Sequence, residues 1–562
     1  MSEPVDPITL EVVRSALIAC ADEMATVLSR TAYNMMIYEV HDFCVGLLDP
    51  EGQIVAQNTG GLPIFLADLG AAIVDGVRTF GPDRFAPGDV VLMNYPYICG
   101  QHLNNVVVYT PFFHDGALVA FPAVRAHWVD IGGARVGFGP GGTTEIYAEG
   151  LQLRSVKLYE AGRLNDSIER IIADNVRLPH AALGDLRAQI AACRVGERRL
   201  AELYDRYGAP TIAACVRQIW DQAETLARQA VRAIPDGEYC AESFLDPDPF
   251  HPEAGPIPIR VRVVVEGDRF TVDFSGLPPQ LRGSLNAGES GGVAAARVAF
   301  KAVTLPDLPV NEGAFRPLRV LLPPGTMLSA QPPAPVGNWS LSLPTVVDTL
   351  LRALAPALPH LIPAGHKADM GGYTFHGFDR ARGRPFIAMG ITGGGWGGRP
   401  HEDGPNATVS ICQGDVRNVP VELQEAYYPL LVERLALRPD SGGDGQYRGG
   451  LGVELRVRAL QDLAVNRSIE RAQCPPWGLH GGQPGAPPCN IVERADGRRE
   501  EYPRTISRLP LAEGDVITIL TGGGGGWGDP AHREPALRAR DRQRGYVTAA
   551  PDGPPPVPQD AP

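Results

Sequence analysis

The uneven distribution of glycine limits what this chain can fold into more than any other feature of its sequence. Residues 165–232 contain almost no glycine, and the stretch ALGDLRAQIAACRVGERRLAELYDRYG repeats apolar residues at helical spacing. From residue 234 onward, segments such as IPIRVRVVVEGDRFTVDFSG read as strand, turn and strand, and glycine-rich runs separate them. With 65 glycines and 53 prolines, the chain needs long loops between its elements. This pattern predicts an α+β fold with mixed β-sheets, helical segments and a glycine-rich, β-dominated C-terminal half.

The 562 residues are too many for one hydrophobic core, so we expect several packed units. Composition divides the chain into an N-terminal α+β domain over 1–164, which holds the candidate metal site described below, a helical segment over 165–233 and a β-rich region over 234–548. Residues 549–562 are proline-rich and are predicted to be disordered.

Charge and cysteine content argue against several classes of protein. The formal net charge is −13 and no basic block occurs, so we expect no nucleic-acid partner. The nine cysteines are odd in number and none are spaced as Cys-x-x-Cys, which favours free thiols in a reducing compartment. No apolar run is long enough to cross a membrane, and the first residues lack the features of a signal peptide. Together these observations predict a cytoplasmic protein without a membrane partner.

A β-hairpin is predicted around one histidine of the first domain. The stretch NYPYICGQHLNNVVVYTPFF places His102 between a polar turn and an apolar strand, and the turn signal HDGA and the strand LVAFPAVRAHW follow directly. With Asp115 and Gly116 at the tip, Asn104 would lie opposite His127. His102 would then be the diagonal neighbour of His127 on the same face, close enough for both imidazoles to bind one cation.

The residues around this pair favour a metal site. Asp130 follows His127 by three positions, and Asn105 lies at the equivalent end of the partner strand, beside Asn104. Imidazole and oxygen ligands suit Zn²⁺, Mn²⁺ or Fe²⁺ better than Ca²⁺. The candidate ligands are therefore His102, Asn105, His127 and Asp130.

The candidate catalytic residues are His102, His127, Asp130 and Arg125. Arg125 precedes His127 by two positions and shares its face in the strand model, where its guanidinium could hold a phosphate or a carboxylate.

A structural interpretation of the histidines stays open. Pro111 and Pro122 lie inside the two predicted strands, which indicates an edge or a bulge. A bulge would shift the register by one residue and place His102 and His127 on opposite faces. Both would then be strand-end residues that satisfy backbone groups.

No nucleotide-binding loop is apparent. A Walker A motif needs Gly-Lys-Ser/Thr, and none of the three lysines, Lys157, Lys301 and Lys367, follows a glycine. The glycine-rich runs at 393–398 and 522–528 lack the strand–loop–helix context of a phosphate-binding loop and are interpreted as turns. His366, Lys367 and Asp369, in AGHKADMGG, are expected either to reach the cavity of the site or to be solvated loop residues.

The stretches PGDVVLMNYPYICGQHLNNVVVYTPFF, AVRAHWVDIGG, LRPDSGGDGQYRGGLGVE and GGGGGWGDP together resemble the B-type subunit of the hydantoinase B, 5-oxoprolinase and acetone/acetophenone carboxylase superfamily. The resemblance covers nearly the whole chain and implies a two-component enzyme. A separate A-type subunit of actin-like ATPase fold would bind ATP and phosphorylate a small carbonyl or lactam substrate. The B-type subunit would complete the reaction at a metal site.

The resemblance also shows where this chain departs from the metal motif of the family, Asn-Asp-Pro-Tyr, Gly-Thr-His-x-x-Asp and Ala-His-His-x-Asp. Tyr95 replaces the first aspartate, Asn105 the second, and Trp128 the second histidine. The loss of two carboxylates would weaken the binding of a divalent cation. Together with Phe65, the aromatic replacements Tyr95 and Trp128 predict a more apolar cavity.

The resemblance favours hydrolysis of a cyclic amide, meaning a hydantoin, oxoproline or lactam, because the chain length fits the hydantoinase B type. ATP-dependent carboxylation of a ketone is the second interpretation, because His-x-Asn-Asn at 102–105 and the aromatic residue after His127 resemble the ketone carboxylases. A third interpretation is a non-catalytic, structural B-type subunit.

Overall fold

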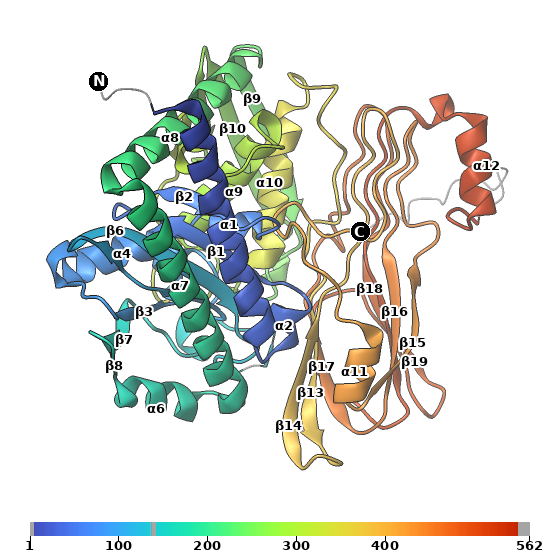
Figure 1. Ribbon diagram of the computed structural model, residues 1–562. Helices are drawn as coiled ribbons and strands as arrows, with labels where there is room; N and C mark the ends of the chain where they lie inside the picture. Colours follow the sequence, from blue (N-terminus) through green and yellow to red (C-terminus); the bar gives the residue numbers. More distant parts are fainter. Residues whose placement is uncertain (1–4, 135, 138–141, 549–562) are drawn as a thin grey trace.

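The computed structural model describes residues 5–134, 136–137 and 142–548, so the tail predicted to be disordered lies outside the described residues. Figure 1 shows a body that contains most of the helices, coloured blue to yellow, beside a β-rich body coloured orange and red. The predicted α+β class and the β-dominated C-terminal part are confirmed. None of the helices in the described part of the chain is both long and apolar enough to cross a membrane.

An antiparallel sheet lies at the centre of the first body, in the order β2-β1-β6-β4-β3-β7-β8, with β5 also paired to β6. Its strands are β1 (Phe43–Leu48), β2 (Ile54–Gln57), β3 (Val90–Met93), β4 (Asn105–Tyr109), β5 (Phe112–His114), β6 (Ala117–His127), β7 (Val156–Glu160) and β8 (Arg163–Leu164). Both faces are buried: in β4, Val106 and Val108 belong to one hydrophobic core, and Val107 and Tyr109 to another.

Long helices cover one face of this sheet, where α1 contacts β1 and β2, and α7 contacts β4 and β6 (Figure 1). The helices of this layer are α1 (Pro7–Thr31), α6 (Asp166–Asn175), α7 (Pro179–Tyr207) and α8 (Ala209–Arg232). Of the segment predicted to be helical over 165–233, α7 packs directly on the first sheet, α6 packs against α7, and α8 packs against α1 and the 3₁₀ turn η4 (Glu312–Phe315).

The opposite face of the sheet packs in a core with further helices and with a second sheet, β12-β11-β10-β9. These elements are α3 (Pro63–Leu66), α4 (Gly70–Phe80), α5 (Pro96–Cys99), β9 (Gly237–Leu245), β10 (Ile257–Glu266), β11 (Arg269–Asp273), α9 (Glu289–Thr304), β12 (Leu318–Leu321) and α10 (Trp339–Leu354). Residues up to Ile362 belong to this core, so part of the region predicted over 234–548 completes the first body. The predicted domain limits stay a prediction.

Two further sheets, β14-β13-β17-β20 and β15-β16-β21-β18-β19, form the second body around their own core. The strands are β13 (Tyr373–Asp379), β14 (Arg384–Gly390), β15 (Leu430–Leu437), β16 (Val453–Ala459), β17 (Leu463–Arg467), β18 (Cys489–Glu493), β19 (Arg499–Tyr502), β20 (Ile506–Leu511) and β21 (Val516–Leu520). The remaining helices are α2 (Met35–Tyr38), α11 (Val421–Tyr427), α12 (Pro535–Gln543) and the 3₁₀ turns η1 (Pro82–Arg84), η2 (Ile146–Ala148), η3 (Pro252–Ala254), η4 (Glu312–Phe315) and η5 (Pro530–His532).

The glycine-rich runs are not turns but extended segments that lie backbone against backbone. Gly398 N donates to Gly525 O at 2.8 Å, and Gly443 N donates to Gly524 O at 2.8 Å. A Cβ atom on Gly524 would lie only 1.8 Å from the carbonyl oxygen of Trp396. Glycine is needed here because neighbouring segments approach too closely for any side chain.

Candidate functional site

The hairpin that carries the site forms with the predicted turn, but its register shifts by one residue next to Pro111. Asn105, rather than Asn104, is therefore the partner of His127. The shift does not separate the two histidines, because His102 lies in the turn before β4 and not in the strand itself. The structure therefore contains the bulge that Pro111 indicated, and it still places His102 close to His127.

Three polar atoms form a small triangle at the end of β4 and β6. His102 Nε2 lies 3.2 Å from His127 Nδ1, and each of these nitrogens lies 3.1 Å from Asn105 Oδ1. Burial lowers the pKa of His102 to about 4 and holds that of His127 well below its usual value. Both imidazoles are therefore neutral near pH 7, as ligands of a metal must be.

The backbone fixes the tautomer of His102. Its Nδ1 lies 3.3 Å from the carbonyl oxygen of Gly337. Because a carbonyl oxygen only accepts hydrogen bonds, we assign the proton to Nδ1. Nε2 then presents its lone pair to the triangle.

The orientation of the Asn105 amide is fixed as well. Asn105 Nδ2 donates to Gln101 Oε1 at 2.8 Å, and Gln101 Nε2 in turn donates to the backbone oxygen of Ile64 at 3.0 Å and to Asp68 at 3.3 Å. With its NH₂ group engaged, Asn105 turns its carbonyl oxygen toward the two histidines. Two corners of the triangle, His102 Nε2 and Asn105 Oδ1, thus present lone pairs toward His127 Nδ1.

Asp42 is a fourth polar group beside the triangle, and the sequence alone did not indicate it. Its Oδ2 lies 3.8 Å from His127 Nδ1, and its Oδ1 has no hydrogen-bond partner within the described part of the chain. Burial raises the pKa of Asp42 to about 7. Asp42 precedes β1, and His127 N donates to its backbone oxygen at 3.1 Å. Asp42 reaches His127 because β1 pairs with β6, and these strands lie too far apart in the sequence for local spacing to predict the contact.

Asp130 and Arg125 lie near the site but bind other groups. The Asp130 carboxylate accepts from the backbone N–H of Arg177 and, at 3.0 Å, from its guanidinium, so it does not join the triangle. Arg125 shares the sheet face of His127 but is fully buried in an ion pair with Asp68. The catalytic roles assigned to Asp130 and Arg125 stay predictions, and the contacts give both residues structural partners.

The aromatic residues expected in the cavity do not line it. Trp128 points to the opposite face of the sheet, where its Nε1 donates to Gln189 at 2.8 Å. Phe65 packs against Trp339 in the second core, and Tyr95 packs against Tyr97. The prediction of a more apolar cavity from these side chains was wrong: Trp128 faces the side of the sheet opposite to His127 because consecutive strand residues alternate, and Phe65 in α3 and Tyr95 before α5 pack against other aromatic rings.

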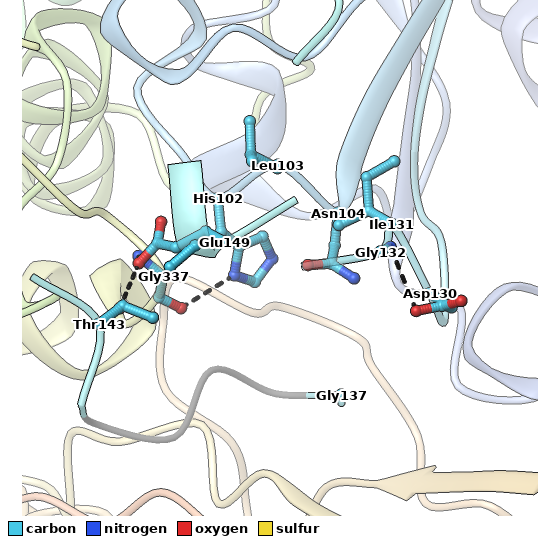
Figure 2. A pocket seen from close by; sticks show the side chains of 11 residues that line it. His102, Leu103, Asn104, Asp130, Ile131, Gly132, Gly137, Thr143, Glu149 and Gly337 are labelled. Atoms are coloured by element: carbon cyan, nitrogen blue, oxygen red, sulfur yellow. Dashed lines mark hydrogen bonds between the residues drawn. The ribbon is translucent and has the colours of Figure 1, made fainter. Parts of the chain in front are cut away.

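Beside His102 lies a small cavity of about 30 Å³, which has room for about one water molecule (Figure 2). Figure 2 shows His102, Glu149 and Thr143 on one side of it and Asp130 on the other. Its lining residues are His102, Leu103, Asn104, Asp130, Ile131, Gly132, Gly137, Thr143, Ala148, Glu149 and Gly337.

The predicted metal set is formed only in part. Among the described residues, no three His, Cys, Asp or Glu side chains gather as metal ligands do. The donors that do meet are the two imidazole nitrogens and the Asn105 oxygen, with the carboxylate of Asp42 beside them. Their spacing, their neutral imidazoles and the unpaired Asp42 oxygen fit a divalent cation.

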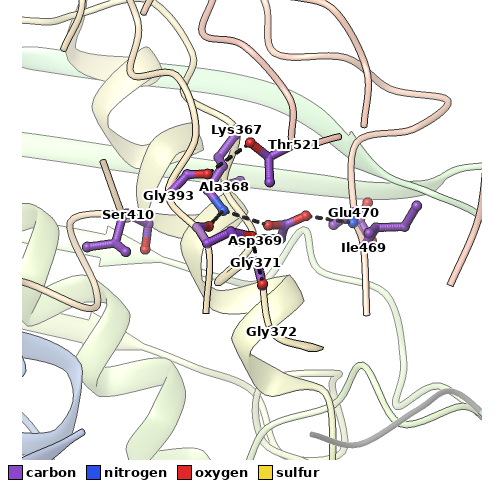
Figure 3. Close-up of polar contacts among 12 residues, drawn as sticks. Lys367, Ala368, Asp369, Gly371, Gly372, Gly393, Ser410, Ile469, Glu470 and Thr521 are labelled. Atoms are coloured by element: carbon purple, nitrogen blue, oxygen red, sulfur yellow. Dashed lines mark hydrogen bonds and ion pairs between the residues drawn. The ribbon is translucent and has the colours of Figure 1, made fainter. Parts of the chain in front are cut away.

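The residues His366, Lys367 and Asp369 lie neither in this cavity nor in solvent. Lys367 Nζ forms a buried ion pair with Asp369 at 3.0 Å and donates to Thr392 O at 2.8 Å (Figure 3). On its other side, Asp369 accepts from the backbone N–H of Glu470 at 3.1 Å. The cluster therefore ties the segment before β13 to the segments that follow β14 and β17.

Comparison with known proteins identifies the family. Residues 6–530 match the family model described as hydantoinase B/oxoprolinase. The chain belongs to this family. It is 33% identical to the caprolactamase subunit beta of Pseudomonas jessenii over 97% of this chain and 94% of the relative. It is also 30% identical to the 5-oxoprolinase of Dictyostelium discoideum, over 93% of this chain and 40% of that longer protein.

Two solved structures share the fold. The crystal structure of the ATP-dependent caprolactamase from Pseudomonas jessenii matches with a TM-score of 0.90 and 30% identity, covering 97% of this chain and 95% of that chain. The nucleotide-free structure of acetone carboxylase matches with a TM-score of 0.88 and 19% identity, covering 96% of this chain and 78% of that chain. The second likeness shows the fold alone. The family resemblance predicted from the sequence is confirmed, as is its prediction that the chain is an enzyme subunit.

Proposed function

We propose that this chain is the B-type subunit of an ATP-dependent heteromeric enzyme that opens a cyclic amide by hydrolysis. The observation that carries the proposal is the full-length likeness to the caprolactamase subunit, combined with a buried His102–His127 pair of which His102 lines a small cavity. ATP would be bound by an A-type subunit of actin-like ATPase fold, since the sequence here contains no Walker A motif. That partner would phosphorylate the substrate carbonyl and so make it electrophilic.

The residues of this chain bind and orient the activated substrate. Burial of the triangle removes bulk water from the reacting carbonyl and strengthens every electrostatic contact there. The Gly337 carbonyl holds His102 so that the lone pair of its Nε2 faces the triangle. Gln101 holds the side-chain amide of Asn105. The imidazoles therefore meet the substrate in one defined orientation.

A divalent cation, Zn²⁺, Mn²⁺ or Fe²⁺, would be held by His102, His127 and Asn105, and its charge would favour the ionised form of the neighbouring Asp42. Such a cation polarises a carbonyl oxygen and lowers the pKa of a bound water toward neutrality. Asp130, which was predicted as a ligand, is engaged by Arg177 and is not part of this set.

Ketone carboxylation is the second candidate function. The fold likeness to acetone carboxylase and the Asn104-Asn105 pair after His102 favour it. Trp128 does not add to this case, because it faces away from the cavity. We further propose a cytoplasmic location, supported by the nine free cysteines.

The experiment uses the complex of this chain with its A-type subunit. The complex is incubated with ATP, labelled bicarbonate and either a lactam, a hydantoin, 5-oxoproline or a ketone. Ring opening without label in the product supports hydrolysis, and label in the product supports carboxylation. Metal analysis of the same preparation and a His102→Ala variant complete the test. Full activity of His102→Ala in a preparation without transition metal would show that the chain is a structural subunit.

A further inference from the structure

Glu149 is a half-buried residue in the cavity wall, and the reaction proposed above does not use its carboxylate. Its Oε1 accepts from Gly337 N at 2.9 Å and from the Thr143 hydroxyl at 2.8 Å, and its Oε2 accepts from Val336 N at 3.0 Å. Burial raises the pKa of Glu149 to about 7, and the three donors act against this by stabilising the charged form. A carboxylate that accepts from three donors holds its neighbours in one arrangement.

The segment that Glu149 holds is the one that sets the tautomer of His102. Gly337 donates its N–H to Glu149 and presents its carbonyl oxygen to His102 Nδ1 at 3.3 Å. The next residue, Asn338, donates its backbone N–H to Ser284 O at 2.8 Å, which fixes the far side of the same peptide.

The close approach of Glu149 also explains the glycine at position 337. A Cβ atom there would lie 2.8 Å from Glu149 Oε1, which is closer than real side chains approach. The segment is therefore shaped for contact with this carboxylate. Figure 2 shows Glu149, Gly337 and His102 in sequence along the cavity wall.

We propose that Glu149 is a positioning residue for His102. By clamping Val336 and Gly337, it holds the Gly337 carbonyl where it accepts from Nδ1 of His102. The lone pair of His102 Nε2 is then kept toward His127 and Asn105. The inference deepens the proposed function, on which its cation measurement rests. Groups that orient a metal-binding histidine in this way typically change metal affinity by about 10- to 100-fold when removed.

The test compares Glu149→Gln with Glu145→Gln in the full chain. Glutamine has the size of glutamate, but its NH₂ group faces one of the two backbone N–H donors and cannot accept from it. Glu145 is exposed and lies four residues away in the same loop, so its variant makes the same charge change without touching Gly337. Thermal unfolding shows whether each variant is folded.

Two readouts follow. The first is the affinity of the purified chain for Zn²⁺, measured by competition with a chelating dye. The second is the tautomer of His102 in the cation-free chain, read from the nitrogen signals of ¹⁵N-histidine-labelled protein and assigned with His102→Gln. We expect Glu149→Gln to weaken Zn²⁺ binding about 10- to 100-fold and to move the His102 proton away from Nδ1. Glu145→Gln should change neither.

The outcomes separate the inference from the proposed function. If the wild-type chain binds no cation, the proposed metal fails, and the tautomer of His102 in Glu149→Gln still decides the positioning role. A folded Glu149→Gln with the wild-type tautomer overturns the inference. If Glu149→Gln does not fold, Glu149→Asp keeps the charge but draws the carboxylate away from Val336 and Gly337 by one methylene, and an unchanged tautomer and Zn²⁺ affinity in that folded variant overturn the inference.

Discussion

Gln101→Met tests whether the orientation of Asn105 sets the affinity of the proposed cation site. In the structure, Asn105 Nδ2 donates to Gln101 Oε1 at 2.8 Å, so the amide oxygen faces the histidines. A flipped amide would place two carbonyl oxygens against each other at that distance. The flip would lose a hydrogen bond worth about 1 kcal/mol and leave a buried acceptor unpaired at a cost of about 1–3 kcal/mol.

Methionine removes this preference while it keeps the volume of the side chain. In the cation-free variant, the Asn105 NH₂ group can then turn toward the lone pair of His102 Nε2 and donate to it. Cation binding must reverse that flip. We expect a loss of about 2 kcal/mol of binding free energy, which is about 30-fold in affinity.

The assay is chelator competition for Zn²⁺ with the purified chain at fixed pH and salt, with thermal unfolding as the check on folding. Gln101→Glu is the control, because a carboxylate oxygen still accepts from Asn105 Nδ2. It should bind Zn²⁺ more tightly than Gln101→Met, although its charge beside Asp68 lowers stability. If folded Gln101→Met binds Zn²⁺ as the wild-type chain does, the amide orientation does not control the site.

Three further predictions concern the frame of the site. Arg125→Met leaves Asp68 as a lone buried charge and should lower the free energy of unfolding by about 3–5 kcal/mol in urea unfolding. Adding Asp68→Asn should recover part of this loss, and no recovery would contradict the ion pair. Gly524→Ala should prevent folding or sharply lower the melting temperature, because its Cβ would lie 1.8 Å from a carbonyl oxygen. Gly522→Ala should be tolerated, because the nearest atom to its Cβ lies at 3.3 Å. Equal effects of the two substitutions would exclude close packing as the reason for the glycines. Burial raises the pKa of Asp185 from 3.8 to about 6, so its contribution to stability is full below pH 3.8 and is lost as the pH rises through 6. The stability of the wild-type chain relative to Asp185→Asn should therefore fall between pH 4 and pH 7 in thermal unfolding, and a constant difference would refute the shift.

The sequence indicated the histidine pair because hairpin geometry is local. The turn after β5 and the apolar runs on either side bring His102 and His127 to the same end of two neighbouring strands. The predicted pairing of Asn104 with His127 was off by one residue, because a bulge adds a residue to one strand. Pro111 indicated that a bulge could occur there, but the sequence did not show whether it does. Asn105, which the sequence placed among the ligands, became the direct partner of His127 through this shift.

The parts of the site that the sequence did not indicate come from distant segments. Asp42 reaches His127 through the pairing of β1 with β6, and Gly337 reaches His102 from the start of α10. Asp130 was expected among the ligands, but its carboxylate forms an ion pair with Arg177, which lies just before α7. Local spacing predicts which strand end a residue occupies, and only the packing of remote elements decides which group its side chain meets.

If Asn105 stands where the family motif has a carboxylate, as the resemblance predicts, the replacement changes the charge of the site more than its geometry. The amide oxygen lies 3.1 Å from both histidine nitrogens and keeps the spacing of a ligand. Asp42 is then the only carboxylate that the structure places beside the triangle within the described part of the chain. A divalent cation bound there would keep a net positive charge, since one carboxylate offsets only half of it. Because phosphorylation by the partner subunit would make the substrate anionic, this remaining charge favours the activated substrate over the unactivated one. The neutral ligand is therefore consistent with a site that receives a phosphorylated intermediate, at the cost of weaker cation binding.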